Sequence, residues 1–212
     1  MSSSEQSAKS ALAALEIVRQ LGDEQFRAGD RELGFNLLDF WQWCSSDLAN
    51  NVMRGIVAEY LVARALDIAT GTRIEWDAYN LITSHGVKVE VKSAAYIQSW
   101  DQAKYSDISF SVAPTQAWDY KANKREGIRK RQADVYVFAL LHHKHKLTLN
   151  PMDMEQWTFY VLPTIILDRE IELTQGSITL SRLLSFGPRQ ASFNDLAQII
   201  DGANPKQDDG EE

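Results

Sequence analysis

The segment Gly86–Lys92 alternates strictly between apolar and charged residues, and it constrains the fold more than any other stretch. Alternation with a period of two residues is typical of a β-strand with one buried face. Its three valines then point into a core, and Lys88, Glu90 and Lys92 share the opposite face. Such a strand needs a sheet around it and a covering layer, so the chain must be built on a β-sheet.

The remaining pattern predicts helices first and mainly strands afterwards. We expect helices over residues 9–21, 32–44 and 51–68, strands over 73–83, 87–95, 108–112, 133–141 and 157–162, and a closing helical segment over 192–200. A basic segment, 121–132, precedes the nearly continuous apolar strand 133–141, which is typical of the middle of a sheet. This order favours the α/β class, with a mixed α+β sheet covered by helices.

Length and composition favour one folded unit. With 212 residues, 44% of them hydrophobic, the chain can bury a substantial core. We expect a single domain over residues 9–201, in which helices at 9–50 precede a central part at 51–141 and a C-terminal extension at 142–201. Residues 1–8 and the acidic tail 202–212 have the composition of disordered segments.

Charge, cysteine content and hydropathy limit the setting. The net charge of −7 argues against a general polyanion-coating protein but permits a local basic groove. The single cysteine, Cys44, suggests a reducing environment. The polar N-terminus does not look like a secretory signal, and the longest apolar run, 135–141, is far shorter than the ~20 residues that span a bilayer. We therefore expect a cytoplasmic protein with no membrane partner.

Glu90 and Lys92 are the first candidates for chemistry. A carboxylate and an ammonium group two residues apart on a strand can hold a metal ion and a water beside a phosphate. Asp77 lies thirteen residues before Glu90, at the start of the preceding apolar stretch. The alternative is a solvated strand face on which charges pair across strands.

Glu59 adds a third acidic group. It is the only charged residue of the helical stripe formed by positions 52, 56, 59, 63 and 66. A buried carboxylate needs a cation or hydrogen bonds. It could form a structural ion pair with an arginine such as Arg73, or it could face the strand that carries Glu90.

Together these residues resemble the PD-(D/E)xK nuclease superfamily. The resemblance covers residues 51–141 and rests on Glu59 on a helix, Asp77 at the start of a hairpin, and Glu90-Val91-Lys92 on its second strand, which is most similar to the resolvase and Mrr-like branches. It implies a restriction-endonuclease-like core (helix, three strands, helix, strand) with extra N-terminal and C-terminal helices.

The resemblance also implies a catalytic arrangement with one or two Mg²⁺ (or Mn²⁺) ions. Asp77 and Glu90 would be the main metal ligands, and Glu59 would bind metal through water or complete a second site. Lys92 would orient or deprotonate the attacking water. Oxygen-only ligation suits Mg²⁺.

The hairpin register leaves the metal ligand open. No proline precedes Asp77. If residues 84–86 form a symmetric three-residue loop, Asn80 rather than Asp77 lies opposite Glu90, which makes Asn80 the alternative ligand position. A bulge or a shifted turn would bring Asp77 there instead.

The basic segment provides a candidate nucleic-acid-binding surface. Its six cations are Lys121, Lys124, Arg125, Arg129, Lys130 and Arg131. They could contact DNA phosphates beside the catalytic face, or form a solvated surface.

Three functions remain open from the sequence. The first is a Mg²⁺-dependent DNA endonuclease in repair, recombination or restriction, with a homodimer as one option. The second is a nucleic-acid-binding module of the same fold with a degenerate site. The third is a non-catalytic interaction protein that uses the tryptophan- and phenylalanine-rich segment 32–44.

Overall fold

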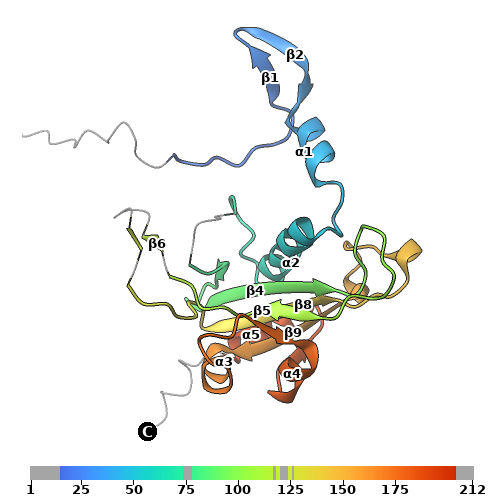
Figure 1. Cartoon of the computed structure of the whole chain (residues 1–212). Helices are drawn as coiled ribbons and strands as arrows, with labels where there is room; N and C mark the ends of the chain where they lie inside the picture. Colours follow the sequence, from blue (N-terminus) through green and yellow to red (C-terminus); the bar gives the residue numbers. More distant parts are fainter. Residues whose placement is uncertain (1–14, 74–77, 117, 120–123, 126, 204–212) are drawn as a thin grey trace, which may run out of the picture.

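A five-stranded mixed sheet forms the centre of the molecule. The computed structural model describes residues 15–73, 78–116, 118–119, 124–125 and 127–203 (Figure 1). The strand order is β11-β9-β8-β4-β3. The strands are β3 (Leu81–Ile82), β4 (Lys88–Ala95), β8 (Val135–Leu141), β9 (Trp157–Pro163) and β11 (Arg189–Ala191). Because β4 and β8 run parallel and the other neighbours antiparallel, the predicted mixed α+β class is confirmed.

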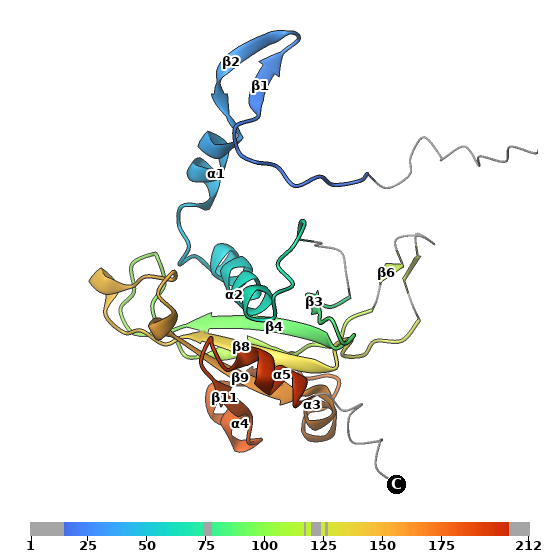
Figure 2. The same ribbon diagram turned by 180° about the vertical axis from the view of Figure 1, so that it is seen from behind.

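Helices cover both faces of this sheet. α2 (Asn51–Ala65) and α5 (Leu196–Asp201) pack on the face that carries Val89 and Val91. The other face is covered by α3 (Thr164–Glu170), α4 (Leu180–Ser185) and a small sheet of β5 (Ser109–Ser111) and β10 (Ser177–Thr179). Figure 2 shows these layers from behind. Two 3₁₀ turns, Lys146–Thr148 and Met154–Gln156, lie between β8 and β9.

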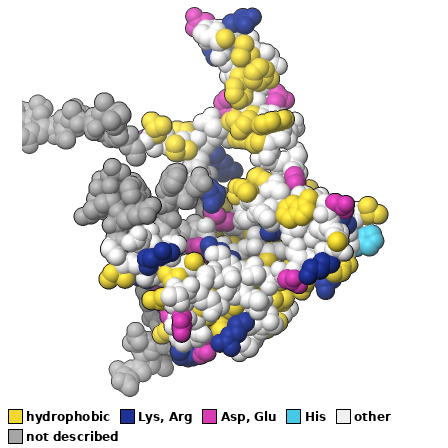
Figure 3. All heavy atoms as spheres, viewed as in Figure 1, with side chains coloured by type: hydrophobic (Ala, Val, Ile, Leu, Met, Phe, Trp, Pro, Cys, Tyr) yellow, Lys and Arg dark blue, Asp and Glu magenta, His cyan; other side chains and the backbone are white. Residues whose placement is uncertain are grey.

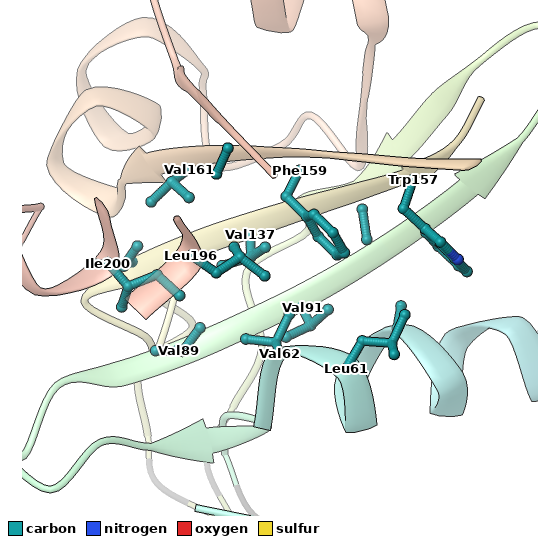
Figure 4. Close-up of a cluster of buried hydrophobic side chains, with 14 of the residues drawn as sticks. Leu61, Val62, Val89, Val91, Val137, Trp157, Phe159, Val161, Leu196 and Ile200 are labelled. Atoms are coloured by element: carbon teal, nitrogen blue, oxygen red, sulfur yellow. The ribbon is translucent and has the colours of Figure 1, made fainter. Parts of the chain in front are cut away.

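β8 is the most buried strand of the sheet. β8 is buried at every position, as its continuous apolar sequence predicts. It pairs with β4 from Val89↔Val135 to Ala95↔Leu141. On one side of this pair, valines of β4 and β8 contact Val62 of α2 and Ile200 of α5 (Figure 4). The alternation in β4 therefore places its valines in the core as predicted.

Local signals fix the ends of α2. The side-chain oxygen of Asn50 accepts hydrogen bonds from the backbone N–H groups of Val52 and Met53, both at 3.0 Å, which satisfies donors that have no partner within the helix. The helix stops before Asp67, whose φ of 55° is left-handed, and the N–H of Ile68 then bonds to the carbonyl of Ala63. The prediction of a helix beginning near Asn51 is confirmed.

The N-terminal predictions need correction. Residues 15–21 are not helical, and the rest of the segment predicted as a helix at 9–21 lies outside the described residues. Instead of a helix over 32–44, a hairpin of β1 (Gln25–Ala28) and β2 (Arg31–Asn36) precedes α1 (Leu37–Ser45). Gly34 has a φ of 79°, which a right-handed helix cannot contain. Asn36 and Asp39 form a capping box that starts the helix later.

The connection from β4 to β8 also differs from the prediction. In the described part of residues 96–134 there is no helix, although the resemblance implied one before the last core strand. Those residues form β5 and a hairpin of β6 (Trp118–Asp119) and β7 (Lys124–Arg125). Among the described residues of the predicted strand 73–83, β3 covers only Leu81 and Ile82, and residues 74–77 lie outside the described set. None of the described helices has the length and apolar character needed to cross a bilayer.

The packing predicts a large loss of stability when the centre of the core is emptied. Phe159 is 0% exposed and stacks on Trp157, so we expect Phe159→Ala to lower the free energy of unfolding by about 3–5 kcal/mol. Urea denaturation followed by circular dichroism would measure this. The matched control is Leu147→Ala, at a site that is 92% exposed, where we expect a change within about 0.5 kcal/mol. Equal effects at the two sites would contradict the assignment of the core.

Candidate active site

The β3–β4 hairpin has the register of a three-residue loop. The N–H of Thr83 bonds to the carbonyl of Val87, and Gly86 adopts a φ of 79° at the last loop position. Leu81 then pairs with Val89. Continuing this register places Asn80 opposite Glu90, which is the first of the two arrangements considered from the sequence. Asp77 lies outside the described residues.

Asn80 links the helix and the strand that carry the two described acids. β3 begins at Leu81, and Asn80, the residue directly before it, bonds to β4 through its side chain. The amide oxygen of Asn80 accepts a hydrogen bond from the N–H of Val91 at 2.8 Å. Its amide nitrogen donates to Oε2 of Glu59 at 3.2 Å. Because its oxygen already has a donor, Asn80 acts here as a bridge between α2 and β4.

Glu59 shows both features that the sequence left as alternatives. Its side chain is buried, and Nε and Nη2 of Arg73 each lie 3.0 Å from Oε2, so the ion pair with Arg73 exists. Burial raises the pKa of the Glu59 carboxyl, the Arg73 guanidinium opposes this, and the negative charge of Glu90 adds to the increase in pKa. The carboxylates of Glu59 and Glu90 are therefore close enough to repel each other.

Glu90 and Lys92 form the second charged pair of the site. They lie two residues apart on the same face of β4, and Nζ of Lys92 is 2.5 Å from Oε1 of Glu90. Both side chains are mostly buried, with exposed fractions of 17% for Glu90 and 30% for Lys92. The strand thus holds one acid and one amine together at a margin that solvent still reaches.

Tyr136 is a site residue that the sequence analysis missed. It is the parallel-strand partner of Glu90 and is buried. Burial raises the pKa of its hydroxyl, and the charge of Glu90 raises this pKa further. The sequence gives no signal for this neighbour, because the pairing of Glu90 with a residue forty-six positions later cannot be read from either strand alone.

Within the predicted basic set, Arg131 differs from Arg129 and Lys130 in burial. Arg131 is buried and ion-paired: its Nη1 lies 2.6 Å from Oδ1 of Asp168, and its Nε donates to the carbonyl of Val112. Arg129 and Lys130 are exposed, although the Arg129 guanidinium bonds to the carbonyl of Pro114. Lys124 and Arg125 form β7, and Lys121 lies outside the described residues.

A cavity of about 410 Å³ adjoins Glu59. Glu59, Arg73 and Asn80 supply polar groups to its lining, and Ile56 and Tyr60 of α2 form part of an apolar wall. Among the residues that the structure describes, no three His, Cys, Asp or Glu side chains converge on one point. The described acids at this site are Glu59 and Glu90, and the predicted ligand Asp77 is outside that set.

One comparison with known proteins assigns a family. The model of the bacteriophage T4 endonuclease IV family matches residues 39–181. The chain belongs to this family. The matched range runs from α1 to α4 and includes Glu59, Asp77, Glu90 and Lys92. A search of curated proteins found no match. Membership in the endonuclease IV family supports the coarser part of the sequence prediction, a nuclease of the hydrolase class.

The raised pKa of Glu59 predicts how stability depends on pH. A carboxyl with a raised pKa holds its proton more tightly in the folded than in the unfolded protein. The free energy of unfolding should therefore fall as pH rises from the pKa of the unfolded chain through that of the folded protein. We expect Glu59→Gln to reduce this fall, measured by urea denaturation at several pH values across this window. Exposed Glu155 provides the control Glu155→Gln; an unchanged pH profile in Glu59→Gln would contradict the prediction.

Proposed function

We propose that this protein is a Mg²⁺- or Mn²⁺-dependent endonuclease that hydrolyses phosphodiester bonds in DNA with a site of the PD-(D/E)xK type. The observation that carries the proposal is that Asn80 joins Glu59 of α2 to β4 beside Glu90, and that the Lys92 ammonium contacts Glu90. Asn80 directly precedes β3, so these groups lie at that end of the β3–β4 hairpin, where Asn80 joins α2 to β4. Membership in the endonuclease IV family supports the same reaction class.

The chemistry of the donors fits a hard divalent cation. Glu59 and Glu90 offer only oxygen ligands, and their mutual repulsion favours a cation between them. We assign Glu90 and Asp77 as the main ligands and Glu59 as a ligand through water or at a second site. When bound, the metal would lower the pKa of a water and neutralise charge on the phosphate.

Lys92 is the proposed water-orienting group. Its ammonium can donate three hydrogen bonds, of which the one to Glu90 fixes its position on the strand. A second can orient the attacking water, and its charge stabilises the negative charge that develops on the phosphate oxygens. Tyr136 borders Glu90 along the neighbouring strand and limits where that carboxylate can turn. Arg73, which now neutralises Glu59, is the residue that a metal at Glu59 would displace.

The arrangement of elements supports a restriction-endonuclease-like core. α2 packs on β4, the β3–β4 hairpin carries the proposed acids, and β8 lies parallel to β4 beside them. The described residues between β5 and β8 depart from that core, because a hairpin occupies part of the connection expected to be helical. We infer a role in repair, recombination or restriction of DNA, in the cytoplasm.

DNA would approach over the exposed part of the basic segment. Arg129 and Lys130 directly precede buried Arg131 and the strand that borders Glu90. They can place a phosphate backbone across the site despite the net charge of −7, because binding depends on the local charge at the groove.

A catalytically inactive DNA-binding protein is the second candidate. The observation in its favour is that Glu59 already has Arg73 and Asn80 as partners. The two candidates differ in cleavage but agree on DNA binding, so cleavage and binding must be measured separately.

Substitution of the strand pair should abolish cleavage. We expect Glu90→Gln and Lys92→Ala each to reduce the rate of DNA cleavage in Mg²⁺ by on the order of a hundredfold or more, because each removes a group that acts in the transition state. The wild-type protein should lose activity in EDTA and regain it with Mg²⁺ or Mn²⁺.

The control for this experiment is Lys88→Ala. Lys88 lies on the same face of β4, two residues before Glu90, and its ammonium packs over the Tyr79 ring. Circular dichroism would confirm that all variants are folded. DNA binding without cleavage by the wild-type protein would favour the second candidate. Full activity in both Glu90→Gln and Lys92→Ala would refute the proposed site.

The basic segment should separate into residues that bind DNA and one that stabilises the fold. We expect Arg129→Ala combined with Lys130→Ala to weaken DNA binding roughly uniformly across sequences and to flatten its dependence on salt by about two phosphate contacts. Arg131→Ala should instead lower the free energy of unfolding, because it leaves Asp168 without its partner. Fluorescence anisotropy at several salt concentrations and urea denaturation would test both; an unchanged salt dependence in the double variant would contradict the first assignment.

A further inference from the structure

The N-terminal hairpin and α1 form an arm, residues 22–45, that projects from the body (Figure 1). Within these residues only Gly22 is buried. The arm is nevertheless tied together: the N–H of Leu38 bonds to the carbonyl of Gly22 at 2.8 Å, and Phe26 and Phe35 pack with ring centroids 5.0 Å apart. Its apolar side chains point to solvent along its length, as Figure 3 shows.

An ordered arm of this composition needs a covering surface. Seven large apolar residues of the hairpin and helix are exposed, with Trp43 at 84% the most exposed: Phe26, Leu33, Phe35, Leu38, Phe40, Trp41 and Trp43. At the usual size of such side chains they leave roughly 700 Å² in water, close to the ~800 Å² that each partner buries in a stable complex. A lone two-stranded hairpin with a short helix is marginally stable by itself.

The link between arm and body fixes the arm away from its own α2. Oδ1 of Asp47 accepts hydrogen bonds from the N–H groups of Ala49 and Asn50, both at 3.1 Å. The side chain of Asn50 donates to the carbonyl of Asp47 at 2.6 Å and also caps α2. A turn held by these bonds is a defined bend, so the arm does not fold back onto the body of the same copy.

The body carries a second apolar surface. Val52, Ile56 and Tyr60 lie four residues apart on α2 and form one stripe. Val52 is 71% exposed and Tyr60 is 55% exposed, and Ile82 of β3 adds another exposed apolar side chain. Ile56, Tyr60 and Ile82 also line the cavity beside Glu59, to which Arg19 of the segment before the arm contributes as well. One chain thus presents two unpartnered apolar surfaces that its own geometry keeps apart.

We propose that the arm of one copy covers the α2 stripe of a second copy, and that the reciprocal contact forms a two-fold dimer. A second copy is the occupant that the structure favours, because both surfaces belong to the same chain and one two-fold exchange covers them all. Contact between two arms alone would leave the α2 stripe in water. The exchanged arm would form a wall of the cavity next to Glu59, although the dimer does not depend on the proposed nuclease activity.

The mass of the protein in solution gives the first test. Analytical ultracentrifugation should show the wild-type chain with twice its mass of 24.0 kDa at micromolar concentration. Either Phe40→Ser combined with Trp43→Ser in the arm, or Val52→Glu combined with Tyr60→Glu on α2, should raise the dissociation constant on the order of a hundredfold. Leu147→Ser, at an exposed apolar residue outside both surfaces, should leave it unchanged. A monomeric wild-type protein would overturn the proposal.

The single cysteine distinguishes the two possible dimers. Cys44 is exposed on α1 beside Trp43. The wild-type chain would be mixed with a longer-tagged chain that carries Cys44→Ser and Tyr60→Cys, and a short bis-maleimide would be added. Arm exchange predicts a cross-linked species with the mass of one chain of each length. Cross-links formed only between two wild-type chains would show arm-to-arm contact and refute the exchange. Neither experiment uses cleavage, so its outcome is separate from that of the proposed nuclease.

Discussion

The parallel pairing of β4 with β8 is the constraint on which the rest of the structure depends. It buries seven consecutive residues of β8 and places the valines of β4 against α2 and α5. The same pairing brings Tyr136 beside Glu90 and directs Glu90 and Lys92 away from that apolar layer. Because a parallel pair requires a long connection, the chain between the two strands is free to carry β5 and the basic segment. The same strand pairing therefore positions both the apolar core and the residues of the candidate site.

Burial of Glu59 is the main cost of this arrangement. An acid inside the α2–β4 contact loses hydration, and Arg73 and Asn80 compensate for that loss. Asn80 serves both α2 and β4. The N–H group of Val91 lies beyond the last backbone pair of β3 with β4, and the amide oxygen of Asn80 provides its acceptor. Asn80, the alternative metal ligand that the sequence offered, is thus engaged in hydrogen bonds that hold the fold together. The negative charge that a divalent metal ion requires would come from Glu59, Glu90 and the proposed ligand Asp77.

The sequence predicted the parts of the fold in which one periodicity dominates. The alternating strand β4, the apolar strand β8 and a helix beginning at Asn51 all formed as expected. The sequence left two hairpin registers open, and the structure has the one with the three-residue loop, in which Gly86 takes a φ of 79° at the last loop position. The predicted helix over 32–44 forms only from Leu37 and was wrong for residues 32–36, because Gly34 and the Asn36 capping box divide the segment into strand and helix.

Long-range pairing explains what the sequence could not supply. Tyr136 and Asp168 acquire their roles only after β8 pairs with β4 and α3 packs beside β9. Arg131 looks like one of a run of surface cations in the sequence, yet in the fold it pairs with Asp168, whereas the Arg73–Glu59 pair was one of the two alternatives that the sequence offered for Glu59. Arginines held in such pairs are less available to bind a polyanion. The exposed pair Arg129 and Lys130, next to the strand that borders Glu90, is therefore where local charge can outweigh the net charge of −7.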